Sequence, residues 1–307
     1  MREIDETGKN SEKRIDGYKR KKKINFGDIM IILILIFLCL TCIIPFIHLA
    51  AKSISSDTEV LARSVYLIPK GINFDAYKSI FKDGQLTHAM VYSVYMTAIF
   101  TFLAMIVTIC AAYPLTKKRL KGRNVINFIL LFTLYFNAGL IPEYLLMKNL
   151  KLLNNMWVLI LPLMFSPWNM LIMKSYLQTS IPDSLEESAF LDGATDFEIL
   201  FRIVLPLSKP ILATLSLFYA VGRWNAYADA KYYITKKALQ PIQLILSNMV
   251  LSSSLDAISL SEGAEVVSTP EVIQAATVMF ATIPIICIYP FVQKYFVKGV
   301  MIGAVKG

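Results

Sequence analysis

Charged residues are scarce in this chain of 307 residues, and apolar residues are abundant. Asp, Glu, Lys and Arg make up 17% of the sequence, whereas a soluble domain carries about 25%. Apolar residues make up 56%, and the mean hydropathy is +0.55. So much apolar surface needs lipid as a second solvent. The composition therefore excludes an ordinary soluble domain and predicts an integral membrane protein.

Cysteine and histidine, the usual ligands of transition metals, are also rare. The chain holds four cysteines and two histidines. Cys39 and Cys42 have C-x-x-C spacing, but both lie inside an apolar run with no second Cys or His pair nearby. We therefore predict no metal site and no redox site. The cysteines are expected to face lipid or to pack between helices.

Motifs for nucleotide binding and hydrolysis are absent. The sequence contains no G-x-x-x-x-G-K-[ST], so it has no loop that cradles phosphates. It also contains neither H-E-x-x-H nor G-x-S-x-G. We predict that the chain is not an enzyme, has no catalytic residue and holds no cofactor of its own.

The net charge of +9 comes from basic residues gathered at the ends of apolar runs. Nucleic-acid binding would need a basic stripe with interleaved aromatics, which the sequence lacks. Basic clusters flanking apolar runs are instead typical of the cytoplasmic ends of spanning helices. We therefore expect membrane lipid as a partner, and no nucleic acid.

Six apolar runs are long enough to cross a bilayer, which takes about 20 residues as a helix. We therefore predict an all-α, polytopic membrane protein with six transmembrane helices. The expected spans are about 28–50, 89–114, 124–146, 156–178, 208–229 and 271–293.

The orientation of the spans follows from their basic flanks. Residues 1–27 form a basic segment, residues 117–123 form a second cluster, and the tail 295–307 holds further lysines. With six spans these three segments lie on one side, which the positive-inside rule makes the cytoplasm. Both termini are therefore expected in the cytoplasm, flanking a permease domain over 28–294.

The expected cytoplasmic loop between spans four and five, residues 179–207, begins with a helix signal. Pro182 suits a first helical turn, and Ser184 with Glu187 has capping-box spacing. Gly193 can adopt the left-handed conformation that ends a helix. The pattern predicts a short helix followed by a turn.

A second short helix is expected directly after that turn. Thr195 and Glu198 repeat the capping-box spacing, and Pro206 stops the helix. A helix this short is marginal in water, so its apolar face needs a partner, either the chain's own spans or another protein. That face consists of Phe197, Leu200, Phe201 and Val204.

The same loop carries a recognisable signature. Glu187-Ser188-Ala189, three residues, Gly193, nine residues and Ile203-Val204-Leu205-Pro206 resemble the pattern E-A-A, x3, G, x9, I-x-L-P. That pattern marks the membrane subunits of binding-protein-dependent ABC importers. The chain departs from it in having serine instead of alanine at position 188.

The resemblance extends beyond the loop. Residues 111–123 look like the end of the second span in sugar permeases, and residues 222–225 like the end of their fifth. The tail, residues 298–307, is similar to that of oligosaccharide permeases, including the polysaccharide-uptake branch.

The resemblance implies a function and a set of partners. The chain would be a permease subunit in a bacterial cell membrane, passing a sugar or oligosaccharide that an extracytoplasmic solute-binding protein delivers. It would work with a second permease subunit and a pair of ATP-binding subunits that hold ATP and Mg²⁺. The loop would dock on the ATPase as a coupling helix, through Glu187, Ser188, Ala189, Gly193, Phe197, Leu200, Phe201, Ile203, Leu205 and Pro206.

Polar residues inside the expected spans are candidates for the translocation pathway, because polar groups at membrane depth tend to face an interior. Interfacial anchoring is the alternative, since Trp and Arg favour that depth whatever the function. The long stretch 230–270 either contacts the binding protein or is a plain connector. The pathway candidates are Asn137, Asn169, Arg223, Trp224 and Asn225.

Two other functions remain open from the sequence. An importer of amino acids, peptides or ions would share the loop signature. An ion-coupled secondary carrier would show paired repeats and polar sites near the bilayer midplane. The chain has no evident internal repeat and few acidic residues in its spans, which favours the importer.

Overall fold

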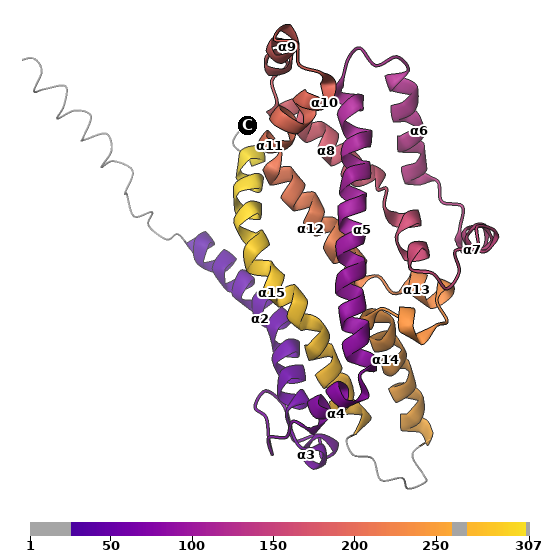
Figure 1. The fold of residues 1–307 in the computed structure, drawn as a ribbon. Coiled ribbons are helices and arrows are strands. Elements are labelled where there is room, and N and C mark those ends of the chain that lie inside the picture. The colour runs from indigo at the N-terminus through magenta and orange to yellow at the C-terminus, as the bar shows by residue number, and fades with distance from the viewer. Residues whose placement is uncertain (1–25, 260–268, 305–307) are drawn as a thin grey trace, which may run out of the picture. The chain divides into compact units, whose positions relative to one another are not determined.

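The computed structural model of the protein describes residues 26–259 and 269–304 (Figure 1). Within these ranges, helices are the only regular secondary structure. Most of the expected basic segment 1–27, part of the stretch 230–270 and the end of the tail 295–307 lie outside the described residues. The all-α expectation is confirmed for the part of the chain that the structure describes.

The chain divides into two units, one ending at His48 and one beginning at Leu49. Helix α2 (Phe26–Ser53) supplies the described part of the first unit. It is apolar on all sides, and its side chains from Ile29 to Phe46 are exposed. A 28-residue helix of this kind fits a bilayer, where lipid replaces the missing protein neighbours.

Helix α5 (Gln85–Thr116) is the central helix of the second unit. At 32 residues it is about 48 Å long. It packs against α8 (Pro167–Ser180) and α12 (Lys209–Asn225), which run beside it in Figure 1. It begins after Gly84, which has a left-handed backbone (φ 69°), and ends where Lys117 turns extended.

Three other apolar segments are bent. Helices α6 (Arg123–Tyr135) and α7 (Leu140–Asn149) meet at 113°. The 3-10 segment Met156–Leu163 meets α8 at 49°, and the segment Asp196–Leu207 meets α12 at 81°. With α2, α5 and the first part of α15 (Pro270–Ala304), the described residues hold three long apolar helices, or six spans if each bent pair counts as one. Six spans remains a prediction.

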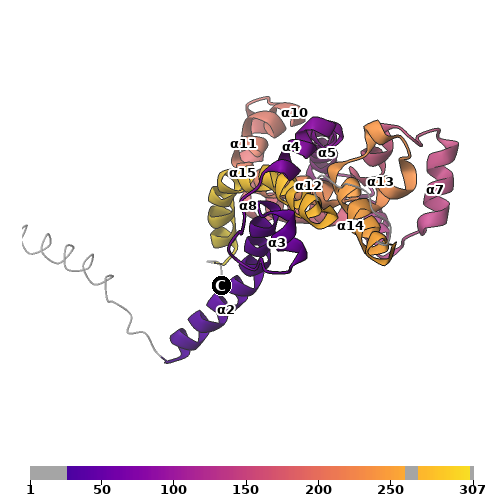
Figure 2. The same cartoon turned by 90° about the horizontal axis from the view of Figure 1, so that it is seen from below.

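Two hydrophobic clusters surround the two ends of α5. One joins the Thr116 half of α5 to α8 and α12 around Met173 and Leu215. The other joins the Gln85 end to α4 (Asp75–Asp83), α14 (Ile242–Ser259) and the start of α15. Figure 2 views the molecule from the Gln85 end, where α3 (Asp57–Leu61) and α4 lie beside α15.

Polar contacts fix the connections at this Gln85 end. Asp57 Oδ1 accepts hydrogen bonds from the backbone and the hydroxyl of Thr269, at 2.7 and 3.0 Å. Lys52 pairs with Glu271 at 2.5 Å. The segment before α4 is therefore tied to the first turn of α15.

Candidate functional site

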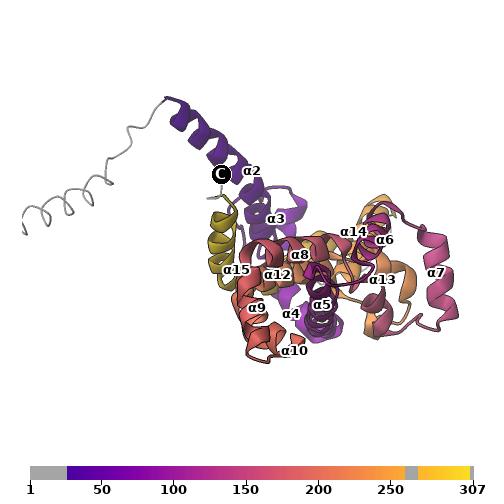
Figure 3. The ribbon, with the colours of Figure 1, turned by 90° about the horizontal axis from the view of Figure 1, so that it is seen from above.

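The site gathers at the Thr116 end of α5. Helices α9 (Asp183–Leu191) and α10 (Asp196–Ile199) lie at this end of α5 (Figures 1 and 3), and α11 (Leu205–Leu207) leads from them into α12 (Figure 1). The structure therefore forms two short helical segments within the expected loop 179–207 and brings them next to the basic run that begins at Lys117.

Helix α9 begins one residue after Pro182, which is its N-cap and supplies no side-chain hydrogen bond. The expected capping box of Ser184 and Glu187 is wrong, because Ser184 already lies inside the helix, where its carbonyl accepts the Ser188 hydroxyl at 2.8 Å. Asp183 and Glu186 occupy the first turn instead. Carboxylates in that position stabilise a helix by facing its positive end.

Gly193 ends α9 as predicted, with φ +84°. The amide of Ala194 donates to the carbonyl of Ala189 at 2.9 Å, and the amide of Gly193 donates to Phe190 at 3.0 Å. This bond pair is the Schellman motif, which satisfies the last carbonyls of a helix. The left-handed backbone, not crowding, selects glycine here, because an added Cβ would meet no atom within 4 Å.

The capping box at the start of α10 is confirmed. The amide of Glu198 donates to Thr195 Oγ1 at 3.3 Å, and the amide of Thr195 donates to the Glu198 carboxylate at 3.0 Å. These backbone and hydroxyl hydrogen bonds lower the pKa of Glu198 below its usual value of 4.5. The carboxylate is therefore held in its charged form.

The second helical segment runs further than the sequence indicates. Residues Leu200–Val204 form a π-helical turn, Pro206 lies inside α11, and the break falls at Ser208. The turn splits the expected apolar face: Leu200 and Val204 are buried, whereas Phe197 and Phe201 are 75% and 63% exposed. Two aromatic rings thus remain uncovered at this end of the second unit.

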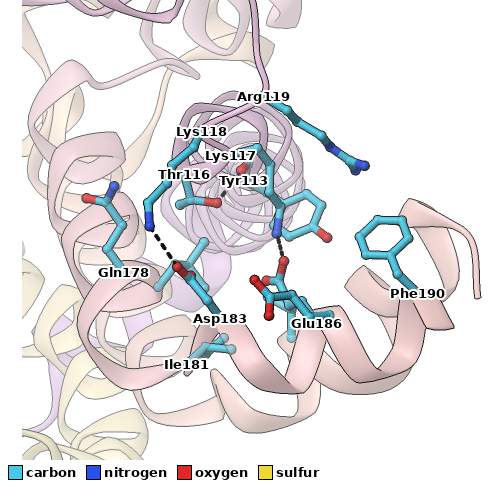
Figure 4. A pocket seen from close by; sticks show the side chains of 13 residues that line it. Tyr113, Thr116, Lys117, Lys118, Arg119, Gln178, Ile181, Asp183, Glu186 and Phe190 are labelled. Carbon is cyan, nitrogen blue, oxygen red and sulfur yellow. Dashed lines mark hydrogen bonds and ion pairs between the residues drawn. The ribbon is translucent and has the colours of Figure 1, made fainter.

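Three consecutive basic residues after α5 pair with acidic residues of this region. Lys117 binds Glu186, Lys118 binds Asp183 at 3.0 Å, and Arg119 binds Asp196 (the first two pairs are drawn in Figure 4). From the sequence we interpreted this basic run as a signal of membrane orientation and as part of the resemblance to sugar permeases, but not as a partner of residues 179–207. The acidic residues in the first turns of α9 and α10 were the sign of a second role.

Aromatic rings support two of these cations. The Lys117 ammonium lies 4.1 Å from the centre of the Tyr113 ring, and the Arg119 guanidinium lies 4.6 Å from that of Phe190. Together these groups border a cleft of about 420 Å³, in which Figure 4 shows Glu186 facing Lys117. Glu187 also lines the cleft, is exposed, and forms no ion pair within the described residues.

The other predicted coupling residues occupy the same surface. Ser188 is exposed, Ala189 is half-buried against the first hydrophobic cluster, and Ile203 and Leu205 are half-buried beside the break at Ser208. The structure therefore gathers the predicted coupling residues in one region. Their role in docking remains a prediction.

The predicted pathway residues are not gathered in one place. Asn137 lies at the exposed break between α6 and α7, where its Oδ1 accepts the amide of Gly139 at 2.7 Å. Asn169 is buried in the first turns of α8, and Asn225 is exposed at the end of α12. A pathway role for these residues remains a prediction.

Arg223 is locked into the protein. Its buried guanidinium holds the Asp229 carboxylate with two bonds of 2.5 and 3.0 Å, and it donates to the carbonyl of Leu159 at 3.0 Å. This pair ties the end of α12 to α13 (Ala228–Tyr233) and to the 3-10 turn Met156–Leu159. No motif in the sequence marks Asp229, so this ion pair could not be predicted.

Trp224, the neighbour of Arg223, borders an apolar pocket of about 570 Å³ between α5, α12 and α15. Its indole N–H is buried without a hydrogen-bond partner among the described residues, and so are the hydroxyls of Thr97 and Thr101 in the same pocket.

The described residues contain no group of three or more His, Cys, Asp or Glu side chains that could hold a metal ion. The geometry of the site is that of a helical membrane protein with a structured, charged loop at one end. Such an arrangement can bind a protein surface through helix α9 and the two exposed rings.

Comparison with known proteins gives the family. Residues 84–302 match the model of the binding-protein-dependent transport system inner membrane component, and the chain belongs to this family of membrane permeases. It is 42% identical to the polygalacturonan/rhamnogalacturonan transport system permease protein YtcP of Bacillus subtilis, over 91% of this chain and 98% of that one. It is 40% identical to protein LplC of Bacillus subtilis, over 86% and 90%.

A solved structure agrees with the family. The chain is similar to one in the crystal structure of a bacterial ABC transporter involved in the import of the acidic polysaccharide alginate. The TM-score is 0.79 with 33% identity, and the match covers 91% of this chain and 99% of the other. The resemblance stated from the sequence is thus confirmed at the level of the family.

Proposed function

We propose that this chain is the permease subunit of an ATP-driven importer of a carbohydrate, and that the ATP is hydrolysed by a separate subunit docked on residues 179–207. The observation that carries the docking site is the pair of exposed rings, Phe197 and Phe201, beside helix α9. Large exposed apolar groups next to a charged rim favour a protein interface over open water.

The free carboxylate of Glu187 supports the same surface. Asp183, Glu186 and Asp196 are already paired within the chain, whereas Glu187 is exposed beside them. A basic group on the ATPase is its expected partner. The ATPase pair would hold ATP and Mg²⁺, and this chain would hold no cofactor.

The orientation in the membrane follows from this surface. The ATPase works in the cytoplasm, so the Thr116 end of α5 faces the cytoplasm and the Gln85 end faces outward. Helices α2, α5, α12 and the first part of α15, together with the bent pairs α6–α7 and Met156–Ser180, then form six spans, with both termini in the cytoplasm. A second permease subunit completes the membrane part, and an extracytoplasmic solute-binding protein delivers the cargo at the Gln85 end.

A carbohydrate is the proposed cargo because of the relatives. YtcP carries polygalacturonan and rhamnogalacturonan in its name, and the solved transporter imports alginate. All three are acidic polysaccharides, since their backbones contain uronic acids. An acidic oligosaccharide is therefore the first cargo to test, ahead of the neutral oligosaccharides of other relatives, such as those of the arabinooligosaccharide permease AraQ of Bacillus subtilis. The relatives give no support to an ion-coupled carrier.

The test of this function is to purify the tagged chain from its own host in mild detergent and identify what co-purifies. A P-loop ATPase is expected with the wild-type chain and is expected to be lost with Glu187→Lys, which reverses the free charge. Glu143→Lys is the control, since Glu143 is also exposed but lies on α7, outside residues 179–207. A wild-type chain that purifies without any ATPase, under conditions that preserve other membrane complexes of that host, would contradict the proposal.

The cargo is tested in a strain that lacks the gene for this chain. Uptake of radiolabelled oligogalacturonides is expected to fall to background and to return with the wild-type gene. Labelled arabinooligosaccharides serve as the comparison. Loss of uptake of the neutral sugar alone would move the cargo to that class, and unchanged uptake of both would reject a carbohydrate of either kind.

A further inference from the structure

Along the polypeptide, helix α9 is connected to the spans only by non-helical residues at each of its ends. Before the helix, Ile181 and Pro182 are extended, and after it Gly193 is left-handed. Further along, the segment Asp196–Leu207 meets α12 at 81° through a break at Ser208. Such joints absorb changes of backbone angle, so they are poor at passing a displacement of α9 to the spans.

The side-chain pairs give α9 a direct connection to α5 instead. Lys117 follows the last residue of α5, and Glu186 lies in the first turn of α9. The two side chains are only 15% and 18% exposed, whereas those of Lys118 and Asp183 are 84% and 75% exposed. Exposed pairs contribute little, but removing one partner of a mostly buried pair leaves a poorly solvated charge.

The Lys117 side chain is also fixed in direction. Its ammonium sits over the Tyr113 ring, one helical turn back, while that ring is itself buried. A cation held between a ring and a carboxylate loses little further entropy on pairing. Of the three ion pairs, Lys117 with Glu186 therefore has the most restricted side-chain motion.

Helix α5 extends from this connection to the Gln85 end of the second unit. Its first turns pack in the second hydrophobic cluster through Leu86, Ala89 and Met90. Ser93 Oγ accepts the amide of Ile242, the first residue of α14, at 2.8 Å. A displacement applied at Lys117 therefore reaches the Gln85 end through one continuous helix.

We propose that Lys117 and Glu186 are positioning residues that join the coupling helix α9 to α5, so that α5 passes the ATP-driven motion of α9 to the Gln85 end. The proposal rests on the proposed function, since the ATPase supplies the motion. It assigns the transmission to the ion pair and α5, in place of the bent connection to α12.

The experiment uses the whole importer complex in nanodiscs, in a background where the four cysteines are replaced by alanine. Spin labels at positions 85 and 150, both exposed, report the distance between the Gln85 end of α5 and the segment after α7 by pulsed electron paramagnetic resonance. Mg²⁺·ATP with vanadate supplies the trapped state. The variants are Lys117→Glu, Glu186→Lys and the charge-exchange double variant, with Lys118→Glu as the control on the exposed pair.

With the wild-type complex and the control, the trapped state is expected to shift the distance between the labels. Each single variant is expected to retain the ATPase and to lose that shift, with transport-coupled ATP hydrolysis at least about tenfold lower. The double variant is expected to restore both. Loss of the distance shift while the ATPase stays bound separates transmission from a merely structural role, because a disordered α9 would lose the ATPase as well. If Lys117→Glu fails to insert, Lys117→Gln removes the charge without adding repulsion.

Two outcomes overturn the proposal. One is an unchanged distance shift in both single variants, and the other is a double variant that stays as defective as the single ones. A wild-type chain that retains no ATPase is a different result, because it rejects the proposed function before any variant is compared.

Discussion

The ammonium of Lys117, just beyond the end of α5, pairs with the carboxylate of Glu186 in the first turn of α9. The two residues are 69 positions apart in the chain. Between them lie α6, α7 and α8, so only the fold brings them together. The pair connects α9, the helix that carries Glu187, Ser188 and Ala189 of the signature, to the central helix α5.

Gly193 tests the turn between α9 and α10. Gly193→Val is expected to leave membrane insertion intact and to weaken retention of the ATPase by tenfold or more, because a β-branched residue at φ +84° costs about 1–3 kcal/mol and shifts α9. Co-purification of the ATPase measures it. Gly222→Val is the control, since Gly222 lies inside α12 with open space around it. Normal transport by the Gly193 variant would reject the predicted role of this turn.

Phe201 tests the exposed apolar surface. Phe201→Ser is expected to keep the chain stable, since the ring is 63% exposed, and to weaken ATPase binding by about 2 kcal/mol, as for a central aromatic residue of an interface. Titration of the purified ATPase against the chain in nanodiscs measures the affinity. Ile68→Ser removes a 76% exposed apolar residue near the opposite end of α5 and is expected to leave the affinity unchanged. Equal affinities for all three chains would remove Phe201 from the interface.

Asp229 tests the buried ion pair. Asp229→Asn leaves the buried Arg223 guanidinium without its charge partner and is expected to cost about 3–5 kcal/mol of stability. Thermal unfolding in detergent, followed by intrinsic fluorescence, measures the loss. Arg223→Met with Asp229→Asn removes both charges and is expected to recover most of the stability. A single variant as stable as the wild type would show that the pair does not hold the end of α12.

Glu198 gives a dependence on pH. Its pKa is lowered by the hydrogen bonds from Thr195, so its contribution to the stability of α10 is complete above about pH 4.5 and is lost as the pH falls through the lower folded value. Amide hydrogen exchange in residues 195–199, followed between pH 6 and pH 3, measures it.

Thr195→Ala is the matched variant for that measurement. It removes the hydroxyl of the capping box, so exchange is expected to be faster near neutral pH and to depend less on pH. Identical pH profiles for the two chains would show that the capping box does not hold this helix.

Much of the local structure of residues 179–207 could be predicted from the sequence because its signals are local. The glycine at 193 and the capping box at 195–198 act on backbone groups within a few residues, and both predictions are confirmed. The Ser184 capping box failed because Pro182 set the start of α9 first. The face of Phe197 and Phe201 was split by a π-helical turn that no local pattern marks.

The sequence by itself was enough to predict that the chain lies in a lipid bilayer, that it is helical and that it belongs to the permease family. Composition excludes a water-soluble domain, and fixed spacing along the loop identifies the permease family, because both are properties of the linear order of residues. Only the tertiary structure decided which charges meet. Lys117 with Glu186, and Arg223 with Asp229 beside Leu159, depend on where bent helices bring distant segments together. No local pattern in the sequence predicts which of these distant residues come into contact.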